Sequence, residues 1–361
     1  MSKDPITKER TFSGNIYFFC SFDVGDDIDL KLVHNNHVFA RTGTFQSQYF
    51  KSYHRPLVLD INQCKVSETC ESAKLYNFGV ISLRYRFPFS APLEDLRRLI
   101  HNFENVCEHK SVEDARSIFS SIRSEIRQPR FFHLSKSYAL IQIKRQAQFS
   151  PAALKEQFGH EIASALRFEK ERLSEYKKNE ILSGMVGYYR GDLLIIDHDS
   201  ALTYDDDYSD LLDIFEFANM RHMELQYFDR LLDKQLNVVY ERQPYKIPLK
   251  AYFPLWGMLT FDPIGELAKL RVDISVVSER LWSSIKFSEE PYYLEVYKML
   301  SEKLDFSTWQ ASIDKKMDVI RDILEVYEHK VAAIRYDMLN ILIAILIFIE
   351  LVIAFLGYIA K

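Results

Sequence analysis

The clearest pattern of apolar and polar positions in the chain is a heptad repeat in its last 57 residues. Apolar or long side chains recur there at spacings of three and four residues, as in a coiled coil. The seam comprises Ile313, Met317, Ile320, Leu324, Tyr327, Val331 and Ile334. It predicts a coiled-coil stalk helix over residues 305–337. Packing within the chain and packing against a second copy are both open interpretations of this seam.

The stalk helix leads without a break into an apolar segment, Met338–Ile359, which contains one charged residue, Glu350. A helix of 22 residues is about 33 Å long, whereas the hydrocarbon core of a bilayer is about 30 Å thick. The segment therefore predicts a single transmembrane helix.

The start of the chain bears on how this helix inserts. Met1–Gly14 is polar and charged, unlike a signal peptide, so we expect a tail anchor. Lys330 and Arg335 precede the span and only Lys361 follows it, a weak bias that favours a large cytoplasmic domain. The expected location is the inner membrane of a bacterium or archaeon, or the mitochondrial inner membrane in a eukaryote.

Residues 1–150 have the pattern of an α/β domain, because runs of strand-forming residues alternate with helical periodicity. The predicted strands are Asn15–Phe22, Leu57–Ile61, Tyr76–Tyr85 and Phe131–Ile143. The predicted helices are Leu93–Cys107 and Val112–Ile126.

Residues 151–304 form a mixed region dominated by long helices. The predicted helices are Pro151–Lys178, Tyr208–Tyr240, Ile264–Phe287 and Pro291–Lys303, and the predicted strands are Met185–Arg190 and Leu193–Asp197. Matched apolar seams on the long helices and the stalk predict an antiparallel bundle. The fold class is therefore α+β, with an N-terminal α/β domain, a long-helix antiparallel bundle and a single C-terminal transmembrane helix.

Such a bundle would bring the loop Glu241–Asp262 to its membrane-proximal end. The loop carries the kinds of side chain that are enriched at a bilayer interface. These are Lys246, Lys250, Tyr252, Phe253 and Trp256. Contact with lipid headgroups is one interpretation, and packing against the rest of the protein is the other.

Composition and motifs give no support to an enzyme. The chain lacks a Gly-x-Gly-x-x-Gly loop, a Walker lysine and a Gly-x-Ser-x-Gly elbow. His222-x-Glu224 is not followed by the Cys-x-x-Cys pair that a zinc deaminase needs. The four cysteines also lack that spacing, so free thiols are expected. We therefore expect no catalytic residues, cofactor, metal or small-molecule substrate.

A basic segment, Ser121–Arg145, contrasts with the net charge of −5 of the whole chain. Its candidate contacts with RNA or the ribosome are Arg123, Arg127, Arg130, Lys144 and Arg145. Cations hold phosphates and interleaved aromatic rings stack on bases, which favours this interpretation. The alternative is a corner between a helix and a strand, with solvated cations and with its rings in the core.

Several passages resemble the "required for meiotic nuclear division"/Sif family. They are the glycine-containing run Phe78–Leu83, the helix Ile162–Glu171, the step Leu281–Tyr297 and the tail from Arg335 to Leu351. The resemblance implies a divergent, prokaryotic member of a family of membrane-anchored proteins that form large homo-oligomers. Mitochondrial members are linked to translation, which implies a role in supporting translation near the membrane. The family has no established catalytic residues.

Two polar residues in the apolar tail, Asn340 and Glu350, bear on what an assembly would do. A carboxylate in the middle of a bilayer costs several kcal/mol, so Glu350 needs shelter. A neutral Glu350 between identical tails indicates a homo-oligomeric scaffold or adaptor on the cytoplasmic face. A ring of charged Glu350 side chains is the alternative and would indicate a pore or transport component.

Overall fold

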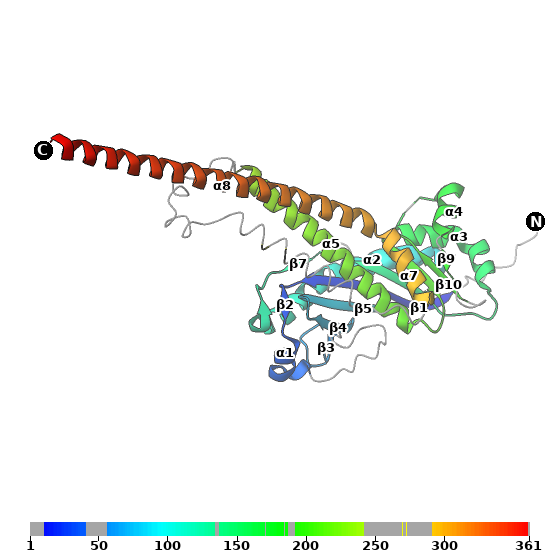
Figure 1. Ribbon diagram of the computed structural model, residues 1–361. Coiled ribbons are helices and arrows are strands. Elements are labelled where there is room, and N and C mark those ends of the chain that lie inside the picture. The colour runs from blue at the N-terminus through cyan, green and yellow to red at the C-terminus, as the bar shows by residue number, and fades with distance from the viewer. Residues whose placement is uncertain are drawn as a thin grey trace, which may run out of the picture. The chain divides into compact units, whose positions relative to one another are not determined.

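The computed structural model describes residues 11–40, 56–133, 137–169, 171–183, 185–186, 192–241, 269, 272 and 291–359. The chain divides into two compact units. The first comprises Met1–Tyr227 and Val277–Trp309, and the second comprises Phe228–Val276 and Gln310–Lys361. Figure 1 shows the elements in chain order by colour.

A mixed sheet is the framework of the first unit. Nine strands are assigned to it among the described residues, in the order β3-β4-β5-β1-β8-β11-β10-β9, with β7 beside β1. They are β1 (Phe12–Asp23), β3 (Leu57–Val58), β4 (Cys70–Tyr76), β5 (Val80–Ala91), β7 (Phe132–His133), β8 (Tyr138–Ile143), β9 (Met185–Val186), β10 (Leu193–Ile196) and β11 (Ser200–Tyr204). The β8–β11 pair is parallel. The sheet therefore runs on past residue 150, the predicted end of the first domain.

The two faces of the sheet differ because side chains alternate along each strand. On β1, Ile16, Phe18 and Phe22 belong to the apolar core, together with residues of helices α2 (Leu93–Ser121) and α3 (Pro151–Arg167). The opposite face is covered by the first part of α5 (Ser209–Glu241), whose Asn219 bonds to β1. The shorter helices are α1 (Leu30–Asn36), α4 (Glu175–Ser183) and α7 (Pro291–Lys303), and β2 (Asp27–Ile28) pairs with β6 (Ile126–Arg127).

The segment predicted as one strand over Tyr76–Tyr85 is a hairpin. Strand β4 ends at Tyr76, a turn follows, and β5 begins at Val80. Gly79 in this turn has φ +90°, and a Cβ atom there would lie 1.7 Å from the Gly25 carbonyl oxygen. The strand pattern was correct on both sides of the turn. The change of chain direction was missed because the turn, Asn77–Gly79, is short and contains Phe78. Strand β5 also continues through Pro88, whose side chain is exposed.

Helix boundaries also differ from the prediction in two places. The two helices expected between Leu93 and Ile126 form the single helix α2. The helix expected over Pro151–Lys178 stops at Arg167, because Phe168 adopts the left-handed conformation with φ +58°. Helix α4 then starts separately, while α7 begins and ends as predicted.

In the second unit, the end of α5 packs against α8 (Phe306–Ile359). Asp229 accepts a hydrogen bond from Ser312 at 2.6 Å, and Lys316 lies 2.7 Å from both Asp229 and Asp233. Ile313 and Ile320 are 2% and 0% exposed. The described start of the seam is therefore buried within the chain.

Among the other seam residues, the structure describes only the side chain of Met317. Met317 is half-buried, and the side chains of Leu324, Tyr327, Val331 and Ile334 lie outside the described residues. The predicted helix Ile264–Phe287 also lies outside them, apart from Lys269 and Val272. The coiled coil and the antiparallel bundle therefore stay predictions.

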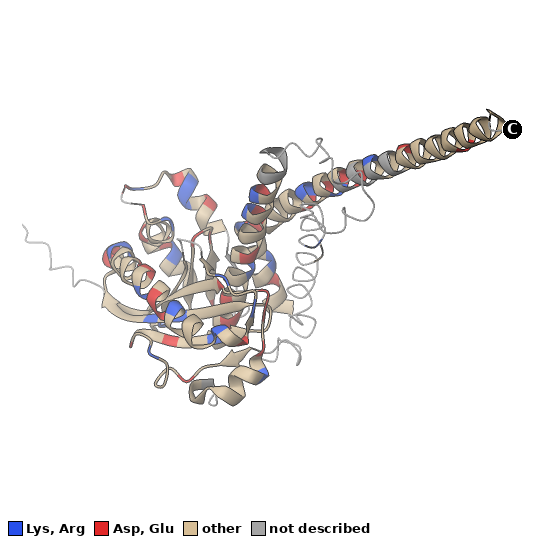
Figure 2. Ribbon diagram, turned by 90° about the vertical axis from the view of Figure 1, so that its left-hand side faces the viewer, with Lys and Arg blue, Asp and Glu red and all other residues tan. Residues whose placement is uncertain are grey.

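The last part of α8, Tyr336–Ile359, is long and apolar enough to cross a membrane. Its most apolar window has a mean hydropathy of 2.9, and none of it is buried in the structure. Figure 2 shows this part of the helix almost without charged residues. Asn340 and Glu350 are both exposed on it.

Candidate functional site

The face of the sheet beneath α5 is lined with polar side chains. Asn15 donates to Gln142 of β8 at 3.1 Å, and Arg86 of β5 donates to Asn15 at 2.9 Å. Asn219 of α5 donates to the Phe19 carbonyl oxygen at 3.0 Å and to the Ser21 hydroxyl at 2.9 Å. Directional polar contacts therefore fix the position of this part of α5 on the sheet.

Buried ion pairs add to these contacts. Lys74 of β4 lies 2.7 Å from Asp213 and 2.8 Å from Glu216, and Arg84 of β5 lies 3.6 Å from both carboxylates. Burial alone would raise the pKa of Glu216, but Lys74 and Arg84 outweigh it and hold that pKa below its usual value. Buried pairs of this kind specify a geometry more than they add to stability.

A second buried cluster lies at the end of β1. Arg130 contacts both carboxylate oxygens of Asp23, with Nε 2.7 Å from Oδ1 and Nη2 2.9 Å from Oδ2, and it also pairs with Asp26. The guanidinium lies 4.8 Å from the centre of the Tyr227 ring. Burial raises the pKa of Asp23 to about 6, and Arg130 limits the shift. One cation thus serves two carboxylates here.

Glu224 of α5 is close enough to Asp23 and Arg130 for their charges to act on it. It is 1% exposed, and its Oε1 atom has no hydrogen-bond partner among the described residues. Burial, and then the charge of Asp23, raise its pKa well above the usual value. Its buried position therefore favours the protonated, neutral form of the carboxyl group over the charged one.

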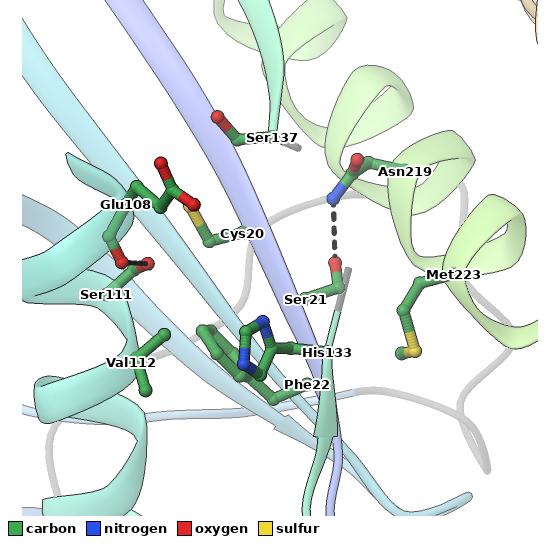
Figure 3. Close-up of a pocket in the computed structure, with 10 residues that line it drawn as sticks. All are labelled: Cys20, Ser21, Phe22, Glu108, Ser111, Val112, His133, Ser137, Asn219 and Met223. Carbon is green, nitrogen blue, oxygen red and sulfur yellow. Dashed lines mark hydrogen bonds between the residues drawn. The ribbon is translucent and has the colours of Figure 1, made fainter. Parts of the chain in front are cut away.

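A small pocket is lined by residues of β1, α2, β7 and α5 (Figure 3). Its volume is about 20 Å³, room for about one water molecule. The lining residues are Cys20, Ser21, Phe22, Glu108, Ser111, Val112, His133, Ser137, Asn219 and Met223. The pocket therefore lies where β1 meets α2 and α5.

The five basic residues proposed for RNA contact do not form one open surface. Arg130 is engaged with Asp23 and Asp26, and Arg145 lies 2.8 Å from Asp205 and also pairs with Asp192. The other three, Arg123, Arg127 and Lys144, are exposed.

The aromatic rings of the same segment are not free for base stacking. Phe131 packs on Phe22 and Phe119, and Phe132 packs on Tyr227. The rings therefore take the core position that the alternative interpretation gives them, and RNA contact stays a prediction for the three exposed cations.

The remaining candidate residues belong to the loop Glu241–Asp262 or are potential metal ligands such as His222. The loop residues Lys246, Lys250, Tyr252, Phe253 and Trp256 lie outside the described residues. His222 is packed against the rings of Phe306 and Trp309, and burial lowers its pKa to about 4. It is therefore a neutral core histidine. No group of three potential metal ligands is brought together in the described part of the chain.

Sequence reasoning missed the buried charges on the α5 side of the sheet. Lys74, Asp23 and Glu216 stand in otherwise apolar strands or helix faces, where a charged residue signals a buried partner. The partners lie 142 residues apart for Lys74 and Glu216, so the sequence does not reveal which charges meet.

Comparison with known proteins gives the chain a family. Residues 13–210 match the family model described as "Uncharacterized protein MJ0711, N-terminal domain". A stretch of 199 residues is 25% identical to "Uncharacterized protein MJ0711" of Methanocaldococcus jannaschii. This match covers 54% of the chain and 58% of the relative, so the chain spans little more than half of that relative's length. No solved structure matches.

These matches correct the resemblance to the Sif family, which was wrong. The family that matches over residues 13–210 is a different one. One of the similar passages, Phe78–Leu83, is also not a glycine-containing strand, because its first two residues form the hairpin turn before β5. The role in translation was implied by that resemblance alone and loses its basis.

Proposed function

The chain belongs to the family described as "Uncharacterized protein MJ0711, N-terminal domain", and from that premise we propose a membrane-anchored, self-associating scaffold. The family description carries no named activity, and the matched region ends at residue 210. The proposal for the anchor therefore depends on α8. In the proposed scaffold, the first unit, which contains the sheet, stays on the cytoplasmic face and presents binding surfaces to partner proteins.

The observation that carries the proposal is the state of Tyr336–Ile359. A segment with a mean hydropathy of 2.9 in which no residue is buried exposes apolar side chains on every side of the helix. Burial of one such side chain is worth about 1.5–3 kcal/mol, so the helix as a whole strongly favours a lipid environment over water. Its 24 residues are enough to span the hydrocarbon core.

Membrane extraction of the full-length protein tests the anchor. We expect the protein to remain in the membrane fraction after washing at alkaline pH, and Ile345→Lys with Ile349→Lys to release it. The matched control, Ala311→Lys with Ala332→Lys, adds the same charges to exposed positions of α8 before the span and should stay membrane-bound. Release of the unmodified protein by the wash would contradict the anchor.

Self-association is supported by the polar residue inside the span. Glu350 needs a polar partner or a proton in lipid, and one candidate span is present in the described part of the chain. The start of the seam is already used within the chain by Ile313 and Ile320. We therefore assign the contact between copies to the span, where neutral Glu350 side chains can hydrogen-bond to one another.

The mass of the detergent-solubilised protein tests this assignment. We expect an oligomer that Glu350→Leu weakens and that Glu350→Gln preserves, because glutamine keeps a hydrogen-bonding side chain. Asn340→Leu serves as a comparison at the other polar position of the span. A monomer of unmodified protein over a range of concentrations would overturn self-association.

A pore is the second candidate function, and the same Glu350 favours it. A ring of charged carboxylates in a membrane would attract cations and line a conduction path. Ion flux into liposomes containing the full-length protein separates the two functions. Flux that Glu350→Gln abolishes while the oligomer persists would favour the pore, and absence of flux with an intact oligomer would favour the scaffold.

A further inference from the structure

Two buried thiols meet between β1 and α2, on the side of the sheet opposite α5. The Sγ atoms of Cys20 and Cys107 lie 3.5 Å apart, and both residues are free thiols. A disulfide has an S–S distance of about 2.05 Å, so the sulfurs need to approach each other by about 1.5 Å. Rotation about the two Cα–Cβ bonds provides a movement of this size.

The two thiols differ in their access to solvent. Cys20 is 8% exposed and lines the small pocket, whereas Cys107 is 0% exposed. Figure 3 shows the Cys20 sulfur directed toward the α2 side of the pocket, where Glu108 and Ser111 lie. The pocket has polar walls and room for about one water molecule, a size that suits an oxidant as small as hydrogen peroxide.

The chemistry of the pair also distinguishes the two thiols. The hydrogen bond with Cys20, followed by burial, raises the pKa of Cys107 far above its usual value. The thiolate of Cys107 is therefore disfavoured. Cys20 is the thiol that lines the pocket, so an oxidant in the pocket meets Cys20, and Cys107, 3.5 Å away, is placed to resolve the product.

We propose that Cys20 and Cys107 form a reversible disulfide when the protein meets a peroxide. The Cys20 sulfur attacks hydrogen peroxide, an S–O bond forms as the O–O bond breaks, and one water leaves. The Cys107 sulfur then attacks the Cys20 sulfenic acid, the S–S bond forms as the S–O bond breaks, and a second water leaves with the Cys107 proton. Two thiols are oxidised and one peroxide is reduced, so the electrons balance.

The cross-link would join positions 87 residues apart, which constrains the unfolded chain and stabilises the unit. It would also fix the part of β1 that holds α5, because Asn219 bonds to Phe19 and Ser21 on either side of Cys20. The disulfide is thus a modification of the same strand that supports the helix leading into the second unit.

Thiol counting on the full-length protein in detergent tests the proposal. We expect hydrogen peroxide to lower the number of reactive thiols in the denatured protein from four to two, and dithiothreitol to restore them. Peptide mass spectrometry should find Cys20 linked to Cys107, and the oxidised protein should unfold at a higher temperature. Cys64→Ser is the matched control and should lose two thiols in the same way, because Cys64 lies apart from the pair.

Three outcomes would overturn the proposal. One is an unchanged thiol count, and another is a Cys20–Cys70 link, since Cys70 is the third buried thiol. The last is a stable sulfenic or sulfinic acid on Cys20 without any cross-link. The mass spectra of the unmodified protein decide between these outcomes even where Cys20→Ser or Cys107→Ser fails to fold.

Discussion

The buried carboxyl groups of the first unit differ in how many cations lie close to them. Glu216 has Lys74 at 2.8 Å and Arg84 at 3.6 Å, whereas Arg130 pairs with Asp23 and Asp26 and acts on Glu224 only through its charge. Among the described residues, Glu224 Oε1 has no hydrogen-bond partner. The pKa values move accordingly, down for Glu216 and up for Asp23 and Glu224. Burial tends to raise the pKa of all three carboxyl groups, and the nearby cations reverse the shift only for Glu216.

The raised pKa values make the first unit less stable at high pH. A carboxyl group that binds its proton more tightly in the folded state stabilises that state fully below its unfolded pKa. For Asp23 this contribution is lost as the pH rises from about 3.8 to about 6, and for Glu224 it is lost over a range that extends higher. The contribution of these two groups to the free energy of unfolding should fall across this range, whereas that of Glu216, whose pKa is lowered, has the opposite sign.

Glu224→Gln tests this pH dependence. The amide has the shape of the neutral acid but cannot ionise, so we expect a gain of about 1 kcal/mol or more at pH 8 and a flatter stability profile between pH 5 and 8. Thermal unfolding in detergent at several pH values measures it. Glu295→Gln, at an exposed position, is the control and should leave the profile unchanged. A variant that is less stable than the unmodified protein at pH 8 would contradict a raised pKa of Glu224.

At the scale of elements, the sequence predicted three of the described helices well, whereas α2 was predicted as two helices and α3 ends earlier than predicted. Helices α5, α7 and α8 have strong 3.6-residue periodicity and clear starts, so their ranges agree with the structure within a few residues. The β4–β5 turn was missed because it spans only Asn77–Gly79 and contains Phe78, so the apolar strand pattern continues through it. Strand β11 was missed because aspartates surround it, and its neighbour β8 is 57 or more residues away.

The Gly79 turn has a direct test at this scale. Gly79→Ala combines a positive φ with a Cβ atom that meets a backbone oxygen, and we expect a loss of about 2–3 kcal/mol of unfolding free energy. Gly357→Ala is the matched control, because no atom lies within 4 Å of its added Cβ. Denaturant titration measures both variants. Equal stability of the two variants would show that the turn has another conformation.

The contact between the sheet and α5 gives a second test. Lys74→Met leaves Glu216 buried without its closest cation, and we expect a loss of about 3 kcal/mol or more in unfolding free energy. Adding Glu216→Leu should recover much of this loss, because the unpaired charge is removed. Lys177→Met breaks the solvent-exposed pair with Glu180 and should leave the stability almost unchanged. A double variant no more stable than Lys74→Met would contradict the buried pair.

At the scale of the whole molecule, the candidate site could be predicted from the sequence only in part. The apolar span and its Glu350 were visible because a membrane helix is a local pattern. The clusters around Arg130 and Lys74 join residues more than a hundred positions apart, and no local pattern encodes such pairs. Arg130 therefore looked like a free cation in the sequence and is an ion-paired residue in the fold.

Salt dependence of RNA binding by the full-length protein measures how many of the five basic residues are free. Each phosphate contact to a single strand contributes a slope of about −0.7 in a log–log plot of affinity against salt concentration. If Arg123, Arg127 and Lys144 alone are available, the slope should be no steeper than about −2, and with a net charge of −5 the binding should be weak. Arg123→Glu with Arg127→Glu should abolish it. A slope near about −3.5 would mean that Arg130 and Arg145 leave their carboxylates to bind phosphate.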